Sequence, residues 1–333
     1  MPFAQKLARF AHKPLPDKVA AVKAMMRSVA LTTSSPQQTG QILGELREIR
    51  KAVERSAILA KEQYVAHALS TERYADPKRL ERHGFKVYSQ YEEDGIIQEI
   101  FRRIGTTDRR FVEFGVEDGL ENNTLKLALE GWCGLWIEGN DNHVAAIRTR
   151  FADVLDDGRL ALQHAFITAE SINQLIGVWG SGEIDFLSID IDGNDFYVWQ
   201  ALNAVKPRAV VIEYNGKFPP PFSIVQKYQP DNVWRGTDYM GASLEALVHL
   251  GRRLGYSLVG TNFPGGNAFF VRNDLTGDKF QAPFSAENHY NPARNFLWQL
   301  YVSGHPPDWG RYVDVPDLAR DQAGGGRVLR GHT

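Results

Sequence analysis

Five short apolar runs that alternate with stretches of helical periodicity constrain the fold more than any other feature of this sequence. The runs cover residues 110–116, 133–140, 159–167, 183–192 and 207–215. Because they are apolar almost throughout, rather than at every second position, each is expected to be a strand buried on both faces. Strands that alternate with helices in this way predict an α/β domain, with a Rossmann-like parallel sheet and helices on both faces.

The flanks of this pattern suggest how the domain ends. An amphipathic helix is expected at 91–105, before the first strand, and the runs at 256–262 and 266–273 could form a closing hairpin. We therefore place the domain at 89–275. An aromatic appendage at 276–319 and a glycine-rich, disordered tail at 320–333 are expected to follow it.

The N-terminal region is predicted to be a separate extension. Residues 1–40 read as a basic arm followed by a linker, and the arm would either lie on anionic lipid or be a solvated, partly ordered segment. Residues 41–88 are expected to be helical. Within 41–69, apolar residues recur at heptad spacing between charged ones, which suits either a coiled-coil homo-oligomer or a helix packed on its own domain.

Composition excludes several classes of function. The net charge of -2 and the absence of a basic stripe argue against a nucleic-acid partner. We expect no transmembrane segment and no signal peptide. The single cysteine, Cys133, cannot form an internal disulfide, so we predict a cytoplasmic protein in which Cys133 is buried as a small apolar residue.

The first strand ends in a turn that suggests a nucleoside cofactor. Glu113 lies near the strand end, and Gly115 and Gly119 follow at a spacing of four. A helix then starts near Asn122, with Asn123 as a candidate cofactor-binding residue. Glycines let the backbone approach a ligand, and a helix start offers unpaired N–H groups. Carboxylates would repel the pyrophosphate of a dinucleotide but attract a sulfonium and an amino group, so we favour S-adenosylmethionine over NAD.

Two further positions complete the predicted cofactor site. Glu138 ends the second strand, where a carboxylate would accept hydrogen bonds from ribose hydroxyls. An adenine pocket is expected after the third strand, near Phe166, on topology alone.

Acidic residues gather after the fourth and fifth strands. Asp190, Asp192 and Asp195 crowd one turn, and Glu213 and Asn215 close the neighbouring strand. Such oxygens suit Mg²⁺, with Asp190, Asp192, Glu213 and Asn215 as its candidate ligands. Without a metal, Asp190 or Asp192 could act as a general base. The alternative is helix capping, which we expect of Asp195 at least. Two histidines, His249 and His289, are candidate bases. His249 lies among apolar residues of a predicted helix, which favours a structural role, and His289 lies in a predicted loop. Neither has a partner visible in the sequence.

The motifs VEFGVEDG (112–119), LSIDIDGNDFYVWQAL (187–202) and PRAVVIEYN (207–215) resemble those of FkbM-type methyltransferases, a branch of the class I S-adenosylmethionine-dependent enzymes. Asp190, Gly193 and Glu213 match the family pattern, whereas Asp192 stands where the family has Glu. The resemblance covers residues 89–273. It implies a class I methyltransferase sheet and O-methylation of a sugar or a similar molecule, as in polysaccharide biosynthesis, with segment 89–95, including Gln90, covering the cofactor.

A long insert at 216–241 follows the fifth strand and mixes aromatic with polar residues. Inserts at this edge often bind substrate, and this composition suits a glycan or nucleotide-sugar acceptor. We therefore predict an O-methyltransferase. Two alternatives remain: a metal-dependent hydrolase that uses the acids after the fourth and fifth strands, or a non-catalytic scaffold.

Overall fold

The computed structural model describes residues 36–297 and 304–315, so predictions for the basic arm and the glycine-rich tail lie outside the described residues. The chain divides into two compact units, Met1–Val65 and Ala66–Thr333. The first contains most of α3 (Pro36–Leu69), the predicted N-terminal helical extension. α3 starts inside the predicted linker, at Pro36. Proline is well tolerated in the first turn of a helix, because backbone N–H groups there make no hydrogen bond within the helix.

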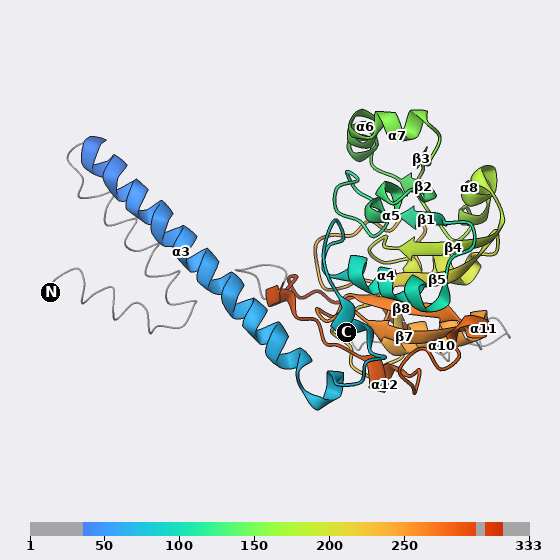
Figure 1. The fold of residues 1–333 in the computed structure, drawn as a ribbon. Coiled ribbons are helices and arrows are strands. Elements are labelled where there is room, and N and C mark those ends of the chain that lie inside the picture. Colours follow the sequence, from blue (N-terminus) through green and yellow to red (C-terminus); the bar gives the residue numbers. More distant parts are fainter. Residues whose placement is uncertain (1–35, 298–303, 316–333) are drawn as a thin grey trace. The chain divides into compact units, whose positions relative to one another are not determined.

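In the described residues, the second unit contains a seven-stranded sheet of order β3-β2-β1-β4-β5-β8-β7 (Figure 1). β1 to β5 are parallel, and β8 runs antiparallel to β5 and β7. The carboxyl ends of β1–β5 therefore meet the amino end of β8 at one edge of the sheet. The strands are β1 (Arg110–Phe114), β2 (Cys133–Glu138), β3 (Leu160–His164), β4 (Gly182–Ile189), β5 (Val205–Glu213), β7 (Tyr256–Thr261) and β8 (Asn267–Arg272).

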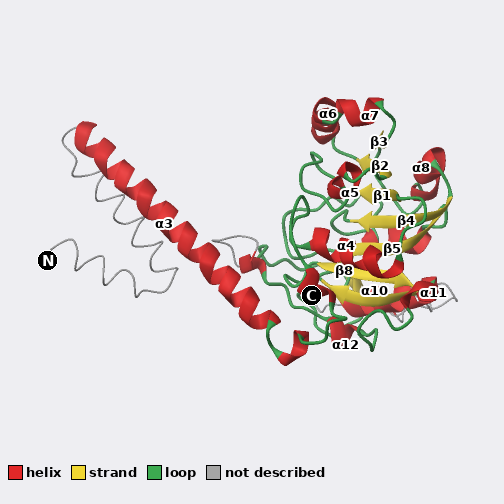
Figure 2. Ribbon diagram, viewed as in Figure 1, coloured by secondary structure: helices red, strands yellow, loops and turns green. Residues whose placement is uncertain are grey.

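Helices cover both faces of this sheet, as predicted (Figure 2). Alternate residues of β1 enter different apolar clusters: Val112 and Phe114 pack in one with α8, α9 and α10, and Phe111 packs in the other with α4, α5 and α6. The helices are α4 (Glu93–Ile104), α5 (Leu125–Leu129), α6 (Asp141–Arg150), α7 (Ala152–Asp156), α8 (Ile172–Trp179), α9 (Asp195–Ala201), α10 (Leu244–Leu254), α11 (Asn273–Thr276) and α12 (Ala286–His289). The α/β fold class is confirmed.

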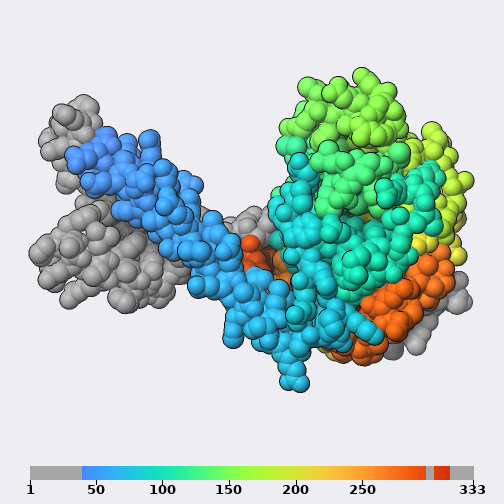
Figure 3. All heavy atoms as spheres, in the orientation of Figure 1, coloured from blue at the N-terminus to red at the C-terminus, as the bar shows by residue number. Residues whose placement is uncertain are grey.

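Segments outside the predicted domain limits also pack on the sheet. Leu80, in the 3₁₀ helix η2 (Leu80–His83), is fully buried beside α4 and β7. Figures 1 and 3 show this segment, in cyan, beside the orange C-terminal elements. Further along the chain, β6 (Ile224–Gln226) pairs with β9 (Tyr312–Asp314), so the 216–241 insert is tied to the C-terminal segment.

Each predicted strand is present, with ends that differ by a few residues because the chain turns away early into loops. Cys133 was wrongly predicted to be buried: it is exposed, since it is the first residue of β2 and precedes the covered part of the strand. Among the described helices, none is long and apolar enough to cross a membrane.

Candidate active site

The turn before α4 is shaped by one carboxylate. Asp94 Oδ2 accepts hydrogen bonds of 2.7–2.9 Å from the backbone N–H groups of residues 87–89. Gly95 is required beside it, because an added Cβ would lie 2.2 Å from a backbone carbonyl oxygen. This turn presents Gln90 and Tyr91 to the cavity described below.

Glu93, the first residue of α4, also hydrogen-bonds to residues at the β7–β8 end of this sheet edge. Glu93 Oε1 accepts hydrogen bonds from the amides of Asn262 at 2.7 Å and Asn267 at 2.9 Å, and its Oε2 accepts one from the backbone N–H of Tyr91 at 2.8 Å. Burial raises the pKa of Tyr91, and the charge of Glu93 raises it further. Tyr91 is thus held in place as a neutral phenol.

Glu113, which is only 3% exposed, holds the loops around it together. Its Oε1 accepts hydrogen bonds from the backbone N–H of Asn123 at 2.9 Å and the hydroxyl of Ser188 at 2.8 Å, and its Oε2 accepts one from the hydroxyl of Thr124. Burial raises the pKa of Glu113 to about 7. The structure therefore gives Glu113 a role in fixing the start of α5 against β4, and its attraction to a sulfonium stays a prediction.

Packing explains both glycines of the β1 turn. Gly115 and Gly119 have φ values of +70° and +82°, a conformation that favours glycine. A Cβ on Gly115 would lie 1.7 Å from the carbonyl oxygen of Asp190, and one on Gly119 would lie 2.6 Å from the ring of Phe151. Gly115 also lines the cavity. Close approach of a ligand to these glycines stays a prediction.

A cavity of about 710 Å³ lies at this edge of the sheet, between the ends of β1–β5 and β8. The described residues that line it include no lysine or arginine. Its acidic residues are Glu113, Glu117, Glu121, Glu138, Asp190, Asp192 and Glu213. An acidic wall with no lysine or arginine among its described lining residues opposes a phosphate ligand and favours a cationic one.

The end of the cavity at β2 and β3 brings two predicted residues together. Glu138 accepts hydrogen bonds from the backbone N–H groups of Asn140 at 2.8 Å and Glu117 at 2.9 Å, one on each oxygen. Each oxygen keeps a further acceptor position for a ligand hydroxyl. Phe166, just after β3, is 51% exposed and lines the same end. An exposed aromatic ring beside a carboxylate can bind the two halves of a nucleoside.

Three acids meet at the middle of the cavity. Carboxylate oxygens of Asp190, Asp192 and Glu213 lie within 4.8 Å of one another, and Glu213 Oε2 is buried without a hydrogen-bond partner. Burial, and then the charges of Asp195 and Glu117, raise the pKa of Asp192 to about 7. Burial and neighbouring acids also raise the pKa values of Asp190 and Glu213. Asp192 also has a left-handed φ of +55°, a strained conformation that is common at functional sites.

The other two residues predicted to bring oxygen atoms to this edge, Asp195 and Asn215, hydrogen-bond to the backbone instead. Asp195 accepts hydrogen bonds of 2.8 Å from the backbone N–H groups of Ile191 and Gly193, so it shapes the turn before α9. Asn215 donates to two carbonyl oxygens of the insert at 3.0 Å and accepts from a backbone N–H. Its amide holds the insert, and ligation of a metal by Asn215 stays a prediction.

The insert is fastened over the start of α9. The hydroxyl of Tyr197 donates to the carbonyl oxygen of Gln226 at 3.0 Å, and the Asn194 amide donates to that of Gln229 at 2.7 Å. Part of the insert lines the cavity through Asn232, Val233, Trp234 and Met240. Asn194, whose amide oxygen was expected at the acidic turn, lines the cavity, whereas sequence reasoning missed His305, because it comes from a distant segment and stands in no recognisable motif.

The two candidate histidine bases lie elsewhere. His249 Nδ1 is 3.0 Å from the hydroxyl oxygen of Ser223, and His249 Nε2 is 3.1 Å from a carboxylate oxygen of Glu245. His289 is fully buried, and burial lowers its pKa to about 3. Neither is among the residues that line the cavity, so neither is placed to act as a base there.

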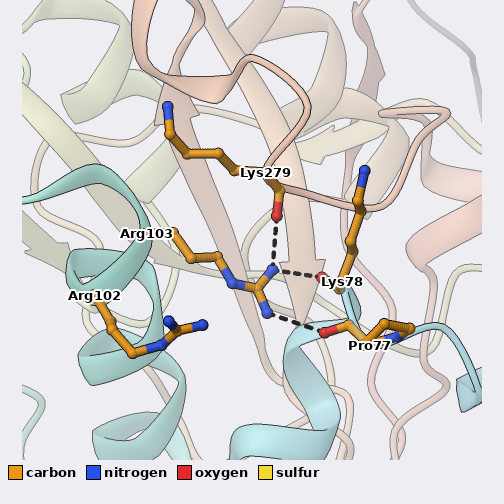
Figure 4. Close-up of a pocket in the computed structure, with 5 residues that line it drawn as sticks. All are labelled: Pro77, Lys78, Arg102, Arg103 and Lys279. Carbon is orange, nitrogen blue, oxygen red and sulfur yellow. Dashed lines mark hydrogen bonds between the residues drawn. The ribbon is translucent and has the colours of Figure 1, made fainter.

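A second hollow, of about 370 Å³, is a structural junction (Figure 4). It is lined by Pro77, Lys78, Arg102, Arg103 and Lys279. Arg103 donates to the backbone carbonyl oxygens of Pro77, Lys78 and Lys279 and to the carboxylate of Glu99. Its guanidinium is therefore taken up by internal acceptors that join three segments of the chain.

Comparisons with known proteins give only remote likenesses. No family model and no curated relative matches the chain. Among solved structures, the N-terminal domain of EvdMO1 with SAH bound is 14% identical, over 67% of this chain and 94% of its own, with a TM-score of 0.36. PKMT2 from Rickettsia typhi is 9% identical, over 61% and 57%, with a TM-score of 0.39. WbdD, a bifunctional kinase-methyltransferase, is 16% identical, over 53% and 38%, with a TM-score of 0.32. At these values the function has to be argued from the site itself.

Proposed function

We propose that this chain is an S-adenosylmethionine-dependent methyltransferase. The observation that carries the proposal is the cavity at the carboxyl edge of the parallel sheet, lined by acids and, in its described residues, by no lysine or arginine. Ligands of open α/β sheets bind at this edge. A dinucleotide would bring a pyrophosphate against these acids, whereas S-adenosylmethionine brings a sulfonium and an ammonium group.

The residues around the cavity fit such a cofactor. Glu138 would accept hydrogen bonds from the ribose hydroxyls, and Phe166 would pack against the adenine. The turn at Gly115, with Asn123 behind it, would face the methionine portion. Gln90, on the turn fixed by Asp94, would cover it.

We further propose that the acceptor is a hydroxyl group of a sugar, a glycan or a similar small molecule. S-adenosylmethionine, when bound, supplies a methyl carbon on a positively charged sulfur. Asp190 or Asp192 would take the hydroxyl proton as the hydroxyl oxygen bonds to that carbon and the carbon–sulfur bond breaks. A pKa raised to about 7 makes Asp192 a stronger base than an exposed aspartate.

The three central acids also fit a divalent cation. Asp190, Asp192 and Glu213 converge within 4.8 Å, and the unpartnered Oε2 of Glu213 has an acceptor position to fill. Oxygen ligands of this kind suit Mg²⁺. A cation held there would polarise the acceptor hydroxyl and offset the repulsion between the acids.

Calorimetric titration of the full chain with S-adenosylhomocysteine tests the cofactor assignment. Loss of a base–aromatic stack costs about 1–3 kcal/mol, so Phe166→Ala should weaken binding by about 5- to 150-fold. Phe222→Ala is the matched control: Phe222 is 54% exposed and is not among the cavity-lining residues, so the affinity should not change.

The same titrations separate the proposal from its alternatives. Absence of S-adenosylhomocysteine binding by the wild type would refute the methyltransferase. If the protein then still bound Mg²⁺, and Asp192→Asn removed that binding, a metal-dependent hydrolase would be favoured. Binding of neither would favour the scaffold, with the heptad seam of α3 as its principal functional feature.

A further inference from the structure

The wall of the cavity beyond Asp192 differs in chemistry from the rest. The acids give way there to two amides, Asn194 and Asn232, and to the aromatic ring of Trp234. A third amide, Gln226, lies behind them: a Cβ on Gly193 would be 3.1 Å from Gln226 Oε1 and 2.6 Å from Asn232 Nδ2. Neutral polar groups thus surround the turn that follows the central acids.

Asn194 presents an unused acceptor at this wall. The residue is only 3% exposed, and its Nδ2 donates to the carbonyl oxygen of Gln229 at 2.7 Å. That bond fixes the orientation of the amide, because the reverse orientation would set two oxygen atoms against each other. Asn194 Oδ1 is therefore left buried without a hydrogen-bond partner. A buried carbonyl oxygen of this kind normally has a donor, which here has to come from a ligand or from water.

The same holds for Gln226. Its Nε2 donates to Asn232 Oδ1 at 3.0 Å, and its Oε1 is buried without a partner. Two buried acceptors around this turn therefore lack donors, and the one that belongs to a lining residue, Asn194 Oδ1, calls for a ligand hydroxyl group or ordered water.

Trp234 adds an apolar surface to these acceptors. Its indole N–H donates to the carbonyl oxygen of Thr237 at 2.8 Å, which fixes the ring. The ring meets that of His305 edge to face, with centroids 4.8 Å apart. A fixed aromatic ring beside hydrogen-bond acceptors matches a pyranose, which has an apolar C–H face and a rim of hydroxyls.

The cavity is long enough for two ligands. It runs from Phe166 after β3 to Asn267 at the start of β8, which are five strand spacings apart. At about 4.8 Å per spacing this edge is about 24 Å long. A nucleoside at the β2–β3 end would therefore leave room near β4 and β5 for a second molecule. The absence of lysine and arginine among the described lining residues disfavours a phosphate on that molecule.

We propose that Asn194, Asn232 and Trp234 form an acceptor subsite for an uncharged pyranose ring. Asn194 Oδ1 accepts a hydrogen bond from a sugar hydroxyl, and Trp234 packs against the C–H face of the ring. Gln226 fixes Asn232 from behind the wall, because its Nε2 donates to Asn232 Oδ1. The inference rests on the proposed methyltransferase function and narrows its acceptor to a neutral glycan, which excludes a nucleotide sugar.

Saturation-transfer NMR on the full chain, saturated with S-adenosylhomocysteine, tests this subsite. The probes are the methyl α-pyranosides of glucose, mannose and galactose, with tetrahydropyran as a ring that has no hydroxyls and UDP-glucose as a charged sugar. We expect saturation transfer to at least one pyranoside and none to tetrahydropyran. Asn194→Leu removes the acceptor, and with it the donor to Gln229, and should weaken binding by at least about fivefold, since a neutral hydrogen bond contributes about 1 kcal/mol. Trp234→Leu should also weaken it, and Phe222→Ala should not.

The outcomes separate the subsite from the methyltransferase function. Absence of transfer to every pyranoside, in a protein that binds S-adenosylhomocysteine, overturns the subsite and leaves the function standing. Equal transfer in wild type, Asn194→Leu and Trp234→Leu overturns the assignment of these residues. Transfer to tetrahydropyran or UDP-glucose as strong as to the pyranosides overturns the choice of a neutral, hydroxylated ring. Failure to bind S-adenosylhomocysteine defeats the proposed function instead.

Discussion

Two neighbouring arginines of α4 give a sharp test of the packing argument. Arg102 and Arg103 both bond to Glu99, yet the Arg102 side chain is 69% exposed and that of Arg103 only 7%. Arg103 also donates to three backbone carbonyl oxygens, of Pro77, Lys78 and Lys279. A lysine in its place keeps the charge but can satisfy only part of this set. With two or three bonds lost at about 1.5 kcal/mol each, Arg103→Lys should lower the free energy of unfolding by about 3–4.5 kcal/mol.

The matched variant Arg102→Lys should cost about 0.5 kcal/mol or less, because an exposed ion pair contributes little. Urea unfolding followed by tryptophan fluorescence measures both values. At about 2–4 °C per kcal/mol in a domain of this size, the melting temperatures of the two variants should differ by about 10 °C. Equal losses in the two variants, or an Arg103→Lys protein within about 1 kcal/mol of the wild type, would refute the reasoning.

Three further predictions follow from the structure. Hydrogen bonds from its two arginine partners lower the pKa of Glu99 from 4.5 to about 2. The stability that ionised Glu99 contributes is therefore complete above about pH 4.5 and is lost as the pH falls towards about 2. In urea titrations, the loss of stability caused by Glu99→Gln should be large at about pH 7 and small at about pH 2.5, and a loss independent of pH would contradict this. Gly115→Ala should prevent stable folding, because its Cβ would lie 1.7 Å from a carbonyl oxygen, whereas Gly131→Ala, with a φ of +84° and nothing within 4 Å, should lower stability by only about 1 kcal/mol in thermal unfolding. If α3 forms a coiled coil, Ile49→Glu in its heptad seam should reduce the mass measured by light scattering to that of a monomer. Arg47→Glu, outside the seam, should leave the mass unchanged. A monomeric wild-type protein would refute the coiled-coil interpretation.

Local sequence was sufficient for the sheet and for part of the site. The five continuous apolar runs identified β1–β5, and the runs at 256–262 and 266–273 identified β7 and β8. The short strands β6 and β9 were not predicted, and β3 is only partly buried, because it lies at the edge of the sheet. The topology of parallel strands then required Glu138, Asp190 and Glu213 to share one edge, and they do line one cavity. Neither step needed knowledge of contacts between distant segments.

The functions of individual polar side chains could not be read in the same way. Glu113 and Asn215 stand in motifs that suggest ligands, but loop N–H groups and carbonyl oxygens far along the chain take up their hydrogen bonds. Conversely, Asn194 gains its unused acceptor only because Gln229 of the insert binds its amide nitrogen. Such roles depend on which distant backbone atom reaches the side chain, and no spacing in the sequence records that.

The exposed thiol of Cys133 allows this protein to be labelled at a single site away from the cavity. It is the only cysteine in the sequence, and it opens β2, whereas Glu138 closes the strand at the cavity. At about 3.3 Å per residue, the thiol is about 17 Å from that end of the strand. A maleimide fluorophore attached there would label the molecule once, without engineered cysteines, at the rim opposite the cavity, so its signal could report on the site without obstructing it.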